Sequence, residues 1–146
     1  MQKKKIESSA PGQWKDTETK VYKEEGGTSF KNIVKRDLID KQCPDVDFET
    51  RYFEISNYGY SSLEKHEHPH VVIIGRGKGK AIVGDEIFEA KPFDIFFIAP
   101  NQAHQFIQTS EEPFGFFCMV ADERDKPRLL NDLEKEKLRK KVDFKD

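Results

Sequence analysis

The chain has 146 residues, of which 36% are hydrophobic and 36% charged, and its 25 basic and 27 acidic side chains give a net charge of −2. This length suffices for one hydrophobic core, and the near-neutral charge offers no global attraction for nucleic acid or an anionic membrane surface. Since no apolar run approaches 18 residues and no basic, apolar leader is present, we expect a cytoplasmic protein without a transmembrane helix or secretory signal.

The hydrophobic residues gather in the middle of the chain, which predicts three parts. Residues 1–28 are rich in charge and contain Ser-Ser-Ala-Pro-Gly and a glycine pair, so we expect a flexible N-terminal arm. Residues 29–122 should form the folded barrel, and residues 123–146 a C-terminal helical extension. Within the latter, leucines at near-helical spacing predict a short helix over 127–140.

Short apolar segments follow one another at intervals of about ten residues in the central part, which is typical of an antiparallel sandwich or barrel. The Gly84-Asp85 pair indicates a two-residue hairpin loop. Cys118 falls in the last strand and is expected to be a small, reduced core residue. The expected strands cover 48–56, 62–74, 78–83, 86–90, 95–98, 105–108 and 114–120.

All four histidines have positions that suit one metal ion: three form the run His66-x-His68-x-His70, and His104 follows later. Residues two apart share a face of a strand, so a single strand would present three imidazoles together. Without a metal, such a row would cost desolvation or mutual repulsion. The pattern therefore predicts one divalent transition metal, and imidazole suits Fe, Mn, Ni, Co, Cu and Zn alike. On such a strand Glu64 would lie on the same face as the histidines, so it is a candidate for proton transfer. The alternative is that it is a solvated surface charge.

Two stretches around these histidines resemble the two motifs of the cupin superfamily. The first runs from Gly59 to Gly77 and includes Glu-Lys-His-Glu-His-Pro-His, and the second runs from Lys91 to Phe106 as Lys-Pro-Phe-Asp-Ile-Phe-Phe-Ile-Ala-Pro-Asn-Gln-Ala-His-Gln-Phe. The resemblance implies a small, single-domain, metal-binding cupin of the conserved-barrel type. Its fold would be all-β, an antiparallel jelly-roll β-barrel. It also implies a homodimer in which the N-terminal arm lies across the partner.

The chain departs from the cupin pattern at two positions. The family holds its metal with two histidines and a glutamate from the first motif and one histidine from the second. Counting back from Gly77 places that glutamate on His70, so the resemblance implies a four-histidine site. In the second motif, Phe93 stands where the family usually has glycine.

Four neutral imidazoles leave a divalent ion with a net charge of +2, whereas three and a carboxylate leave +1. We therefore expect a small anionic metabolite that chelates the ion through two oxygens, such as a keto acid, an enediolate or a dicarboxylate. The reaction would be of the dioxygenase, isomerase or decarboxylase type. The alternative is a non-catalytic cupin that binds or senses a metabolite.

Overall fold

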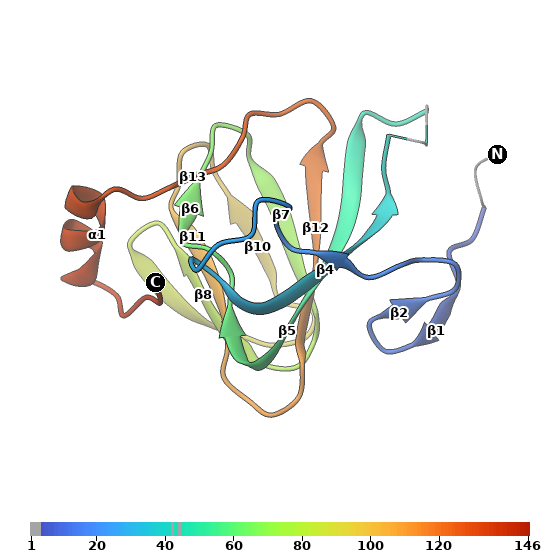
Figure 1. Ribbon diagram of the computed structural model, residues 1–146, viewed down its shortest axis with the longest axis horizontal. Coiled ribbons are helices and arrows are strands. Elements are labelled where there is room, and N and C mark those ends of the chain that lie inside the picture. The colour runs from blue at the N-terminus through green and yellow to red at the C-terminus, as the bar shows by residue number, and fades with distance from the viewer. Residues whose placement is uncertain (1–3, 42, 44) are drawn as a thin grey trace.

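The computed structural model describes residues 4–41, 43 and 45–146, so the first three residues of the expected arm lie outside it. Antiparallel strands curl into a half-barrel, with the helix α1 (Asp132–Arg139) at one end of the long axis and the hairpin of β1 (Ser8–Ala10) and β2 (Gln13–Trp14) at the other (Figure 1). The predicted all-β, antiparallel architecture with a short C-terminal helix is confirmed. Across the described ranges, no helix has the length and apolar character needed to cross a membrane.

Two groups of strands form the wall of the barrel. One group has the order β10-β7-β12-β5-β4, and β5 and β12 pair over eight residues without a register shift. The other group contains β8 and β9, joined by the predicted Gly84-Asp85 hairpin, together with β11, β6 and β13. The bounds are β3 (Lys20–Val21), β4 (Lys31–Ile39), β5 (Phe48–Tyr60), β6 (Glu64–Lys65), β7 (His70–Arg76), β8 (Gly79–Val83), β9 (Glu86–Ala90), β10 (Ile95–Ile98), β11 (His104–Gln108), β12 (Phe114–Ala121) and β13 (Arg128–Leu129).

The core follows from the period-two alternation of these strands. On β12 the even-numbered residues Phe114, Phe116, Cys118 and Val120 are all buried and face the interior. They form one cluster with apolar side chains from β5, β7 and β8. A second cluster lies under the helix, where Leu138 anchors α1 to the barrel. Alternation therefore decides which side chains of each strand can reach an interior pocket.

The helix begins later than the leucine spacing predicts, so the predicted start at residue 127 is wrong. Asn131 caps the helix: its side chain accepts from the Glu134 backbone N–H, and the Glu134 side chain accepts from the Asn131 backbone N–H. This capping box fixes the first turn. Upstream, Arg128 and Leu129 pair with β6 as strand β13.

The histidine run does not form a single strand, which corrects the parity argument. Strand β6 ends at Lys65 and β7 begins at His70, with a bend at residues 67 and 68. The backbone N–H groups of Glu67 and His68 donate to the Asp125 carboxylate at 2.7 and 3.0 Å instead of to a neighbouring strand. Pro69 has no N–H to donate. The three histidines therefore do not share one strand face.

The segment expected as an N-terminal arm contacts its own barrel. The Trp14 ring meets Tyr52 and Phe117 edge-on, with centroids 5.0 and 5.8 Å away. Further along, Tyr22 packs edge-on against Phe53, and the next residue, Lys23, lines the same pocket as these two rings. Residues before the barrel thus contribute directly to its pocket.

Candidate metal centre

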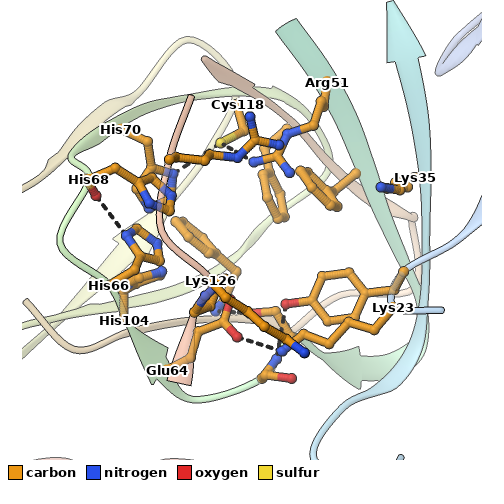
Figure 2. A pocket seen from close by; sticks show the side chains of 18 of the residues that line it. Lys23, Lys35, Arg51, Glu64, His66, His68, His70, His104, Cys118 and Lys126 are labelled. Atoms are coloured by element: carbon orange, nitrogen blue, oxygen red, sulfur yellow. Dashed lines mark hydrogen bonds and ion pairs between the residues drawn. The ribbon is translucent and has the colours of Figure 1, made fainter. Parts of the chain in front are cut away.

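Three histidine rings converge on the concave side of the curled sheet. His70 opens β7, His104 opens β11, and His66 lies just after β6. Their ring centroids form a triangle with sides of 4.8, 4.8 and 4.9 Å, and one ring nitrogen from each lies within 4.8 Å of the others. All three residues are buried, and Figure 2 shows them together on one side of the pocket. This three-histidine cluster suggests a metal ion.

The hydrogen bonds of the three rings determine which nitrogen is free. The Nδ1 atoms of His66 and His104 lie 2.6 and 2.9 Å from the carbonyl oxygens of His68 and Gln102, so each Nδ1 must carry the proton and donate it. The Nδ1 of His70 lies 3.0 Å from the Cys118 sulfur. In His66 and His104 the Nε2 atom is therefore left with a free lone pair.

The chemistry of this donor set fits a divalent metal. Among the described residues, the buried Nε2 of His70 has no hydrogen-bond partner. A buried polar atom without a partner is costly, and a metal bond would satisfy it. Burial is the main cause that lowers the pKa of His70 to about 2 and that of His104 to about 4, and it lowers the pKa of His66 as well. The rings are therefore neutral at pH 7, which is the form that binds metals.

His68 lies beside this triangle and is not part of it. Its ring stacks on that of His66, with centroids 3.7 Å apart and an interplanar angle of 2°, and its centroid is 6.3 Å from that of His70. Its Nδ1 lies 2.7 Å from an Asp125 carboxylate oxygen. That carboxyl has a pKa far below its usual range, chiefly because it accepts from the Glu67 amide. Ligation by His68 stays a prediction.

Glu64 lies in the same pocket as the histidines. Its backbone pairs with that of His104 between β6 and β11, and its side chain is 10% exposed. Lys23 donates to its carboxylate at 2.6 Å. Burial raises the pKa of Glu64 and the Lys23 charge opposes that rise. The carboxylate lines the same pocket as the three histidines, and the proton-transfer role that the sequence suggested stays a prediction.

A pocket of about 520 Å³ opens beside the histidines and extends past Cys118 to Arg51 and Lys35. Part of its wall is aromatic, because Phe53 and Phe106 both stack on Phe116. This volume lies in the range of small-molecule sites. The pocket can therefore hold a compact metabolite against the three histidines.

Sequence reasoning missed several residues of this site. Lys23, Arg51 and Asp125 belong to no motif and are far from the histidines along the chain. Cys118 was expected to be a core residue, and it is indeed buried, but its sulfur also contacts His70 and lines the pocket. For Cys118 there was a signal, since the alternation along residues 114–120 places it on the same face as Phe116.

The profile of the cupin domain matches residues 52–120, which hold the four histidines. An enzyme of Rhodospirillum rubrum named 1-methylthio-D-xylulose 5-phosphate methylsulfurylase is 37% identical over 126 residues, which cover 86% of this chain and 80% of that protein. The chain belongs to the cupin family. As a cupin, it also resembles solved conserved-barrel structures closely. A cupin 2 conserved barrel protein from Rhodopseudomonas palustris has 36% identity and a TM-score of 0.86, with 92% of each chain covered.

A cupin 2 domain-containing protein from Halorhodospira halophila is a further structural relative, with 30% identity and a TM-score of 0.70. The similarity covers 94% of this chain and 90% of that one. Coverage beyond the central motifs means that the N-terminal segment and the C-terminal extension also have counterparts in such relatives. The resemblance therefore extends over nearly the whole cupin chain.

Proposed function

We propose that this cupin is a metal-dependent enzyme that acts on a small, phosphorylated keto metabolite bound to the metal through two oxygens. The observation that carries the proposal is the set of three buried, neutral imidazoles at the wall of a 520 Å³ pocket. The Rhodospirillum rubrum relative is named for a phosphorylated ketose, which supports a substrate of that class. A ketose offers the carbonyl and hydroxyl oxygens that a two-point chelate requires.

His66, His70 and His104 would hold the ion, with His68 as the proposed fourth ligand. Support for His68 comes from its Nδ1 contact with Asp125, because metal-binding histidines commonly donate their other ring N–H to a carboxylate. With four neutral ligands the centre would keep the full charge of a divalent ion. An anionic or enediolate-forming substrate is then favoured over a neutral one.

When bound, the metal would supply Lewis-acid polarisation of a substrate carbonyl. The residues of the chain would orient the substrate, exclude water and move a proton. The stacked Phe53, Phe106 and Phe116 rings form an apolar wall against water. Glu64, held by Lys23 at 2.6 Å, is the proposed proton-transfer group. For a phosphorylated ketose, such a site supports isomerisation through an enediolate or oxygen-dependent cleavage.

The test is metal analysis of untagged protein prepared without chelator, followed by turnover assays. We expect one equivalent of a divalent transition metal per chain. We also expect NMR to show consumption of 1-methylthio-D-xylulose 5-phosphate or of an unsubstituted pentulose 5-phosphate. The His104→Gln variant should lose both metal and turnover. Saturable ligand binding without turnover with any metal would instead favour the non-catalytic binding cupin. Failure to bind any metal would contradict the proposal.

A further inference from the structure

We infer that Arg51 and Lys35 form a binding site for a phosphate monoester at the end of the pocket away from the histidines. The inference rests on the proposed function in one respect, since it places the other end of the same substrate at the metal. Figure 2 shows this arrangement: the histidines lie on one side of the pocket, Lys35 lies on the other, and Cys118 and Arg51 lie between them.

The pocket is lined by five basic and three acidic side chains, and most of the basic ones are already neutralised. The paired cations are Lys23 with Glu64, Lys126 with Glu25, and Arg124 with Glu49. Within the part of the chain that the structure describes, neither Arg51 nor Lys35 forms an ion pair with a carboxylate. These two charges remain available for a ligand.

The Asp37 carboxylate on the neighbouring strand forms its ion pair with Lys20 and none with Arg51 or Lys35 among the described contacts. Asp37 lies opposite Arg51 in the pairing of β4 with β5, yet it accepts from Lys20 at 2.8 Å. That hydrogen bond and the Lys35, Lys20 and Arg51 charges outweigh the effect of burial and lower the pKa of Asp37. Asp37 is therefore ionised and engaged on the side of Lys20.

Arg51 is held in place while most of its donors are unused. Its guanidinium carbon lies 5.0 Å from the centre of the Phe53 ring, and one terminal nitrogen is 3.5 Å from the Cys118 sulfur. Its buried Nε has no hydrogen-bond partner among the residues described. A guanidinium offers five N–H donors in a planar fork that matches two oxygens of a phosphate. Leaving the buried Nε without a partner is costly, and an anion that accepts from it would remove that cost.

Lys35 supplies the second charge from the adjacent strand. It pairs in register with Phe53, which lies two residues from Arg51 on the same face of β5. Diagonal neighbours of this kind have Cα atoms about 7–8 Å apart, within reach of long side chains. A phosphate monoester carries up to two negative charges, and it would meet one cation from each of two adjacent strands. A carboxylate carries a single charge and would neutralise only one of these two cations.

The separation between the three-histidine cluster and Arg51 limits the size of the ligand. Contacts of 3.0 and 3.5 Å connect the His70 Nδ1 to the Cys118 sulfur and the sulfur to the Arg51 guanidinium, across the neighbouring strands β7, β12 and β5. A molecule that places oxygens on the metal and a phosphate on Arg51 therefore has only a short carbon chain between them. The site selects a small sugar phosphate over a nucleotide or a long-chain ester.

The experiment compares binding of D-xylulose 5-phosphate and unphosphorylated D-xylulose to the zinc-loaded protein by calorimetry. A charged hydrogen-bonded contact should make the phosphorylated sugar bind about 10- to 100-fold more tightly. Arg51→Met and Lys35→Met should each reduce this ratio at least fivefold, and Arg51→Lys should retain part of it. Lys126→Met is the matched control, because this lysine lines the same pocket, is 79% exposed at its side chain and is paired with Glu25.

The outcomes separate this inference from the proposed function. Equal affinity for the two sugars in the wild type, or an unchanged ratio in folded Arg51→Met and Lys35→Met, would overturn the phosphate site even if metal binding and turnover persist. Conversely, if the chain binds no metal but inorganic phosphate still binds and competes with the sugar phosphate in an Arg51-dependent way, the phosphate site stands and the metal-dependent function fails. Thermal melting and metal content of each variant establish that the fold is intact.

Discussion

The metal-free protein should lose stability steeply between pH 7 and pH 5. Burial holds the pKa of His70 near 2 and that of His104 near 4 in the folded state, whereas an unfolded histidine has a pKa of about 6.5. The unfolded chain therefore binds more protons than the folded one over this range. The stabilisation from these neutral histidines is fully present above about pH 6.5, the pKa of an unfolded histidine, and is lost as the pH falls below that value.

The size of the effect follows from the same values. A histidine that stays neutral in the folded state and has an unfolded pKa of about 6.5 loses about 2 kcal/mol of stabilisation between pH 7 and pH 5. For His70 and His104 together, the free energy of unfolding should fall by about 4 kcal/mol between pH 7 and pH 5. The lowered pKa of His66 adds to this loss. This is a large share of the 5–15 kcal/mol that typically stabilises a domain. The apo protein should therefore be close to unfolding in mild acid.

The assay is urea unfolding of chelator-treated protein at pH 7 and pH 5, with the His104→Gln variant measured in parallel. Glutamine does not titrate, so this variant should lose about 2 kcal/mol less between the two pH values than the wild type. Carboxylates titrate equally in both proteins, so their contribution cancels when the two changes in unfolding free energy are subtracted. An identical pH dependence in the two proteins would refute the buried-histidine reasoning.

Three further predictions test the surroundings of the site and the surface. Replacing Asp125 with alanine should weaken metal affinity about 10- to 100-fold in competition with a chromogenic chelator, because it removes the partner of the His68 Nδ1; unchanged affinity would argue against His68 as a ligand. Phe93→Gly should raise the free energy of unfolding by about 0.5–1 kcal/mol, since Phe93 has a φ of 75° and is 90% exposed; a loss of stability would contradict this. The expected homodimer should use the terminal strand β10, where Ile95 and Phe97 are 66% and 62% exposed. Changing both to lysine should then give a monomer by light scattering, and a monomeric wild type would contradict the prediction.

Local patterns in the sequence were sufficient for most of the fold. Alternation of apolar residues identified the strands, and the glycine-first pair at residues 84 and 85 identified the β8–β9 hairpin, because both depend only on neighbours in the chain. The late start of α1 was also readable, since Asn131 and Glu134 have the spacing of a capping box. The leucine spacing alone does not mark this cap, and the helix that it predicts is therefore too long at its start.

The path of the histidine run could not be predicted in the same way. Period-two spacing favoured one strand, but the Asp125 carboxylate, more than fifty residues later, binds the backbone at Glu67 and His68 and holds a bend there. A competing partner from a distant segment overrode the local pattern. As a result, His66 and His70 reach the cluster from different elements, and His68 stacks outside it.

By itself, the sequence determined the family, the all-β architecture and the imidazole chemistry of the centre, because motif spacing and residue type carry that information locally. The tertiary structure alone decided which imidazoles meet, which ring nitrogens form hydrogen bonds, and that Cys118, Arg51 and Lys35 continue the pocket away from the three-histidine cluster. Burial and hydrogen-bond partners are set by residues that are distant along the chain and adjacent across the sheet. These long-range contacts convert a pattern of histidines into a site with a defined shape and charge.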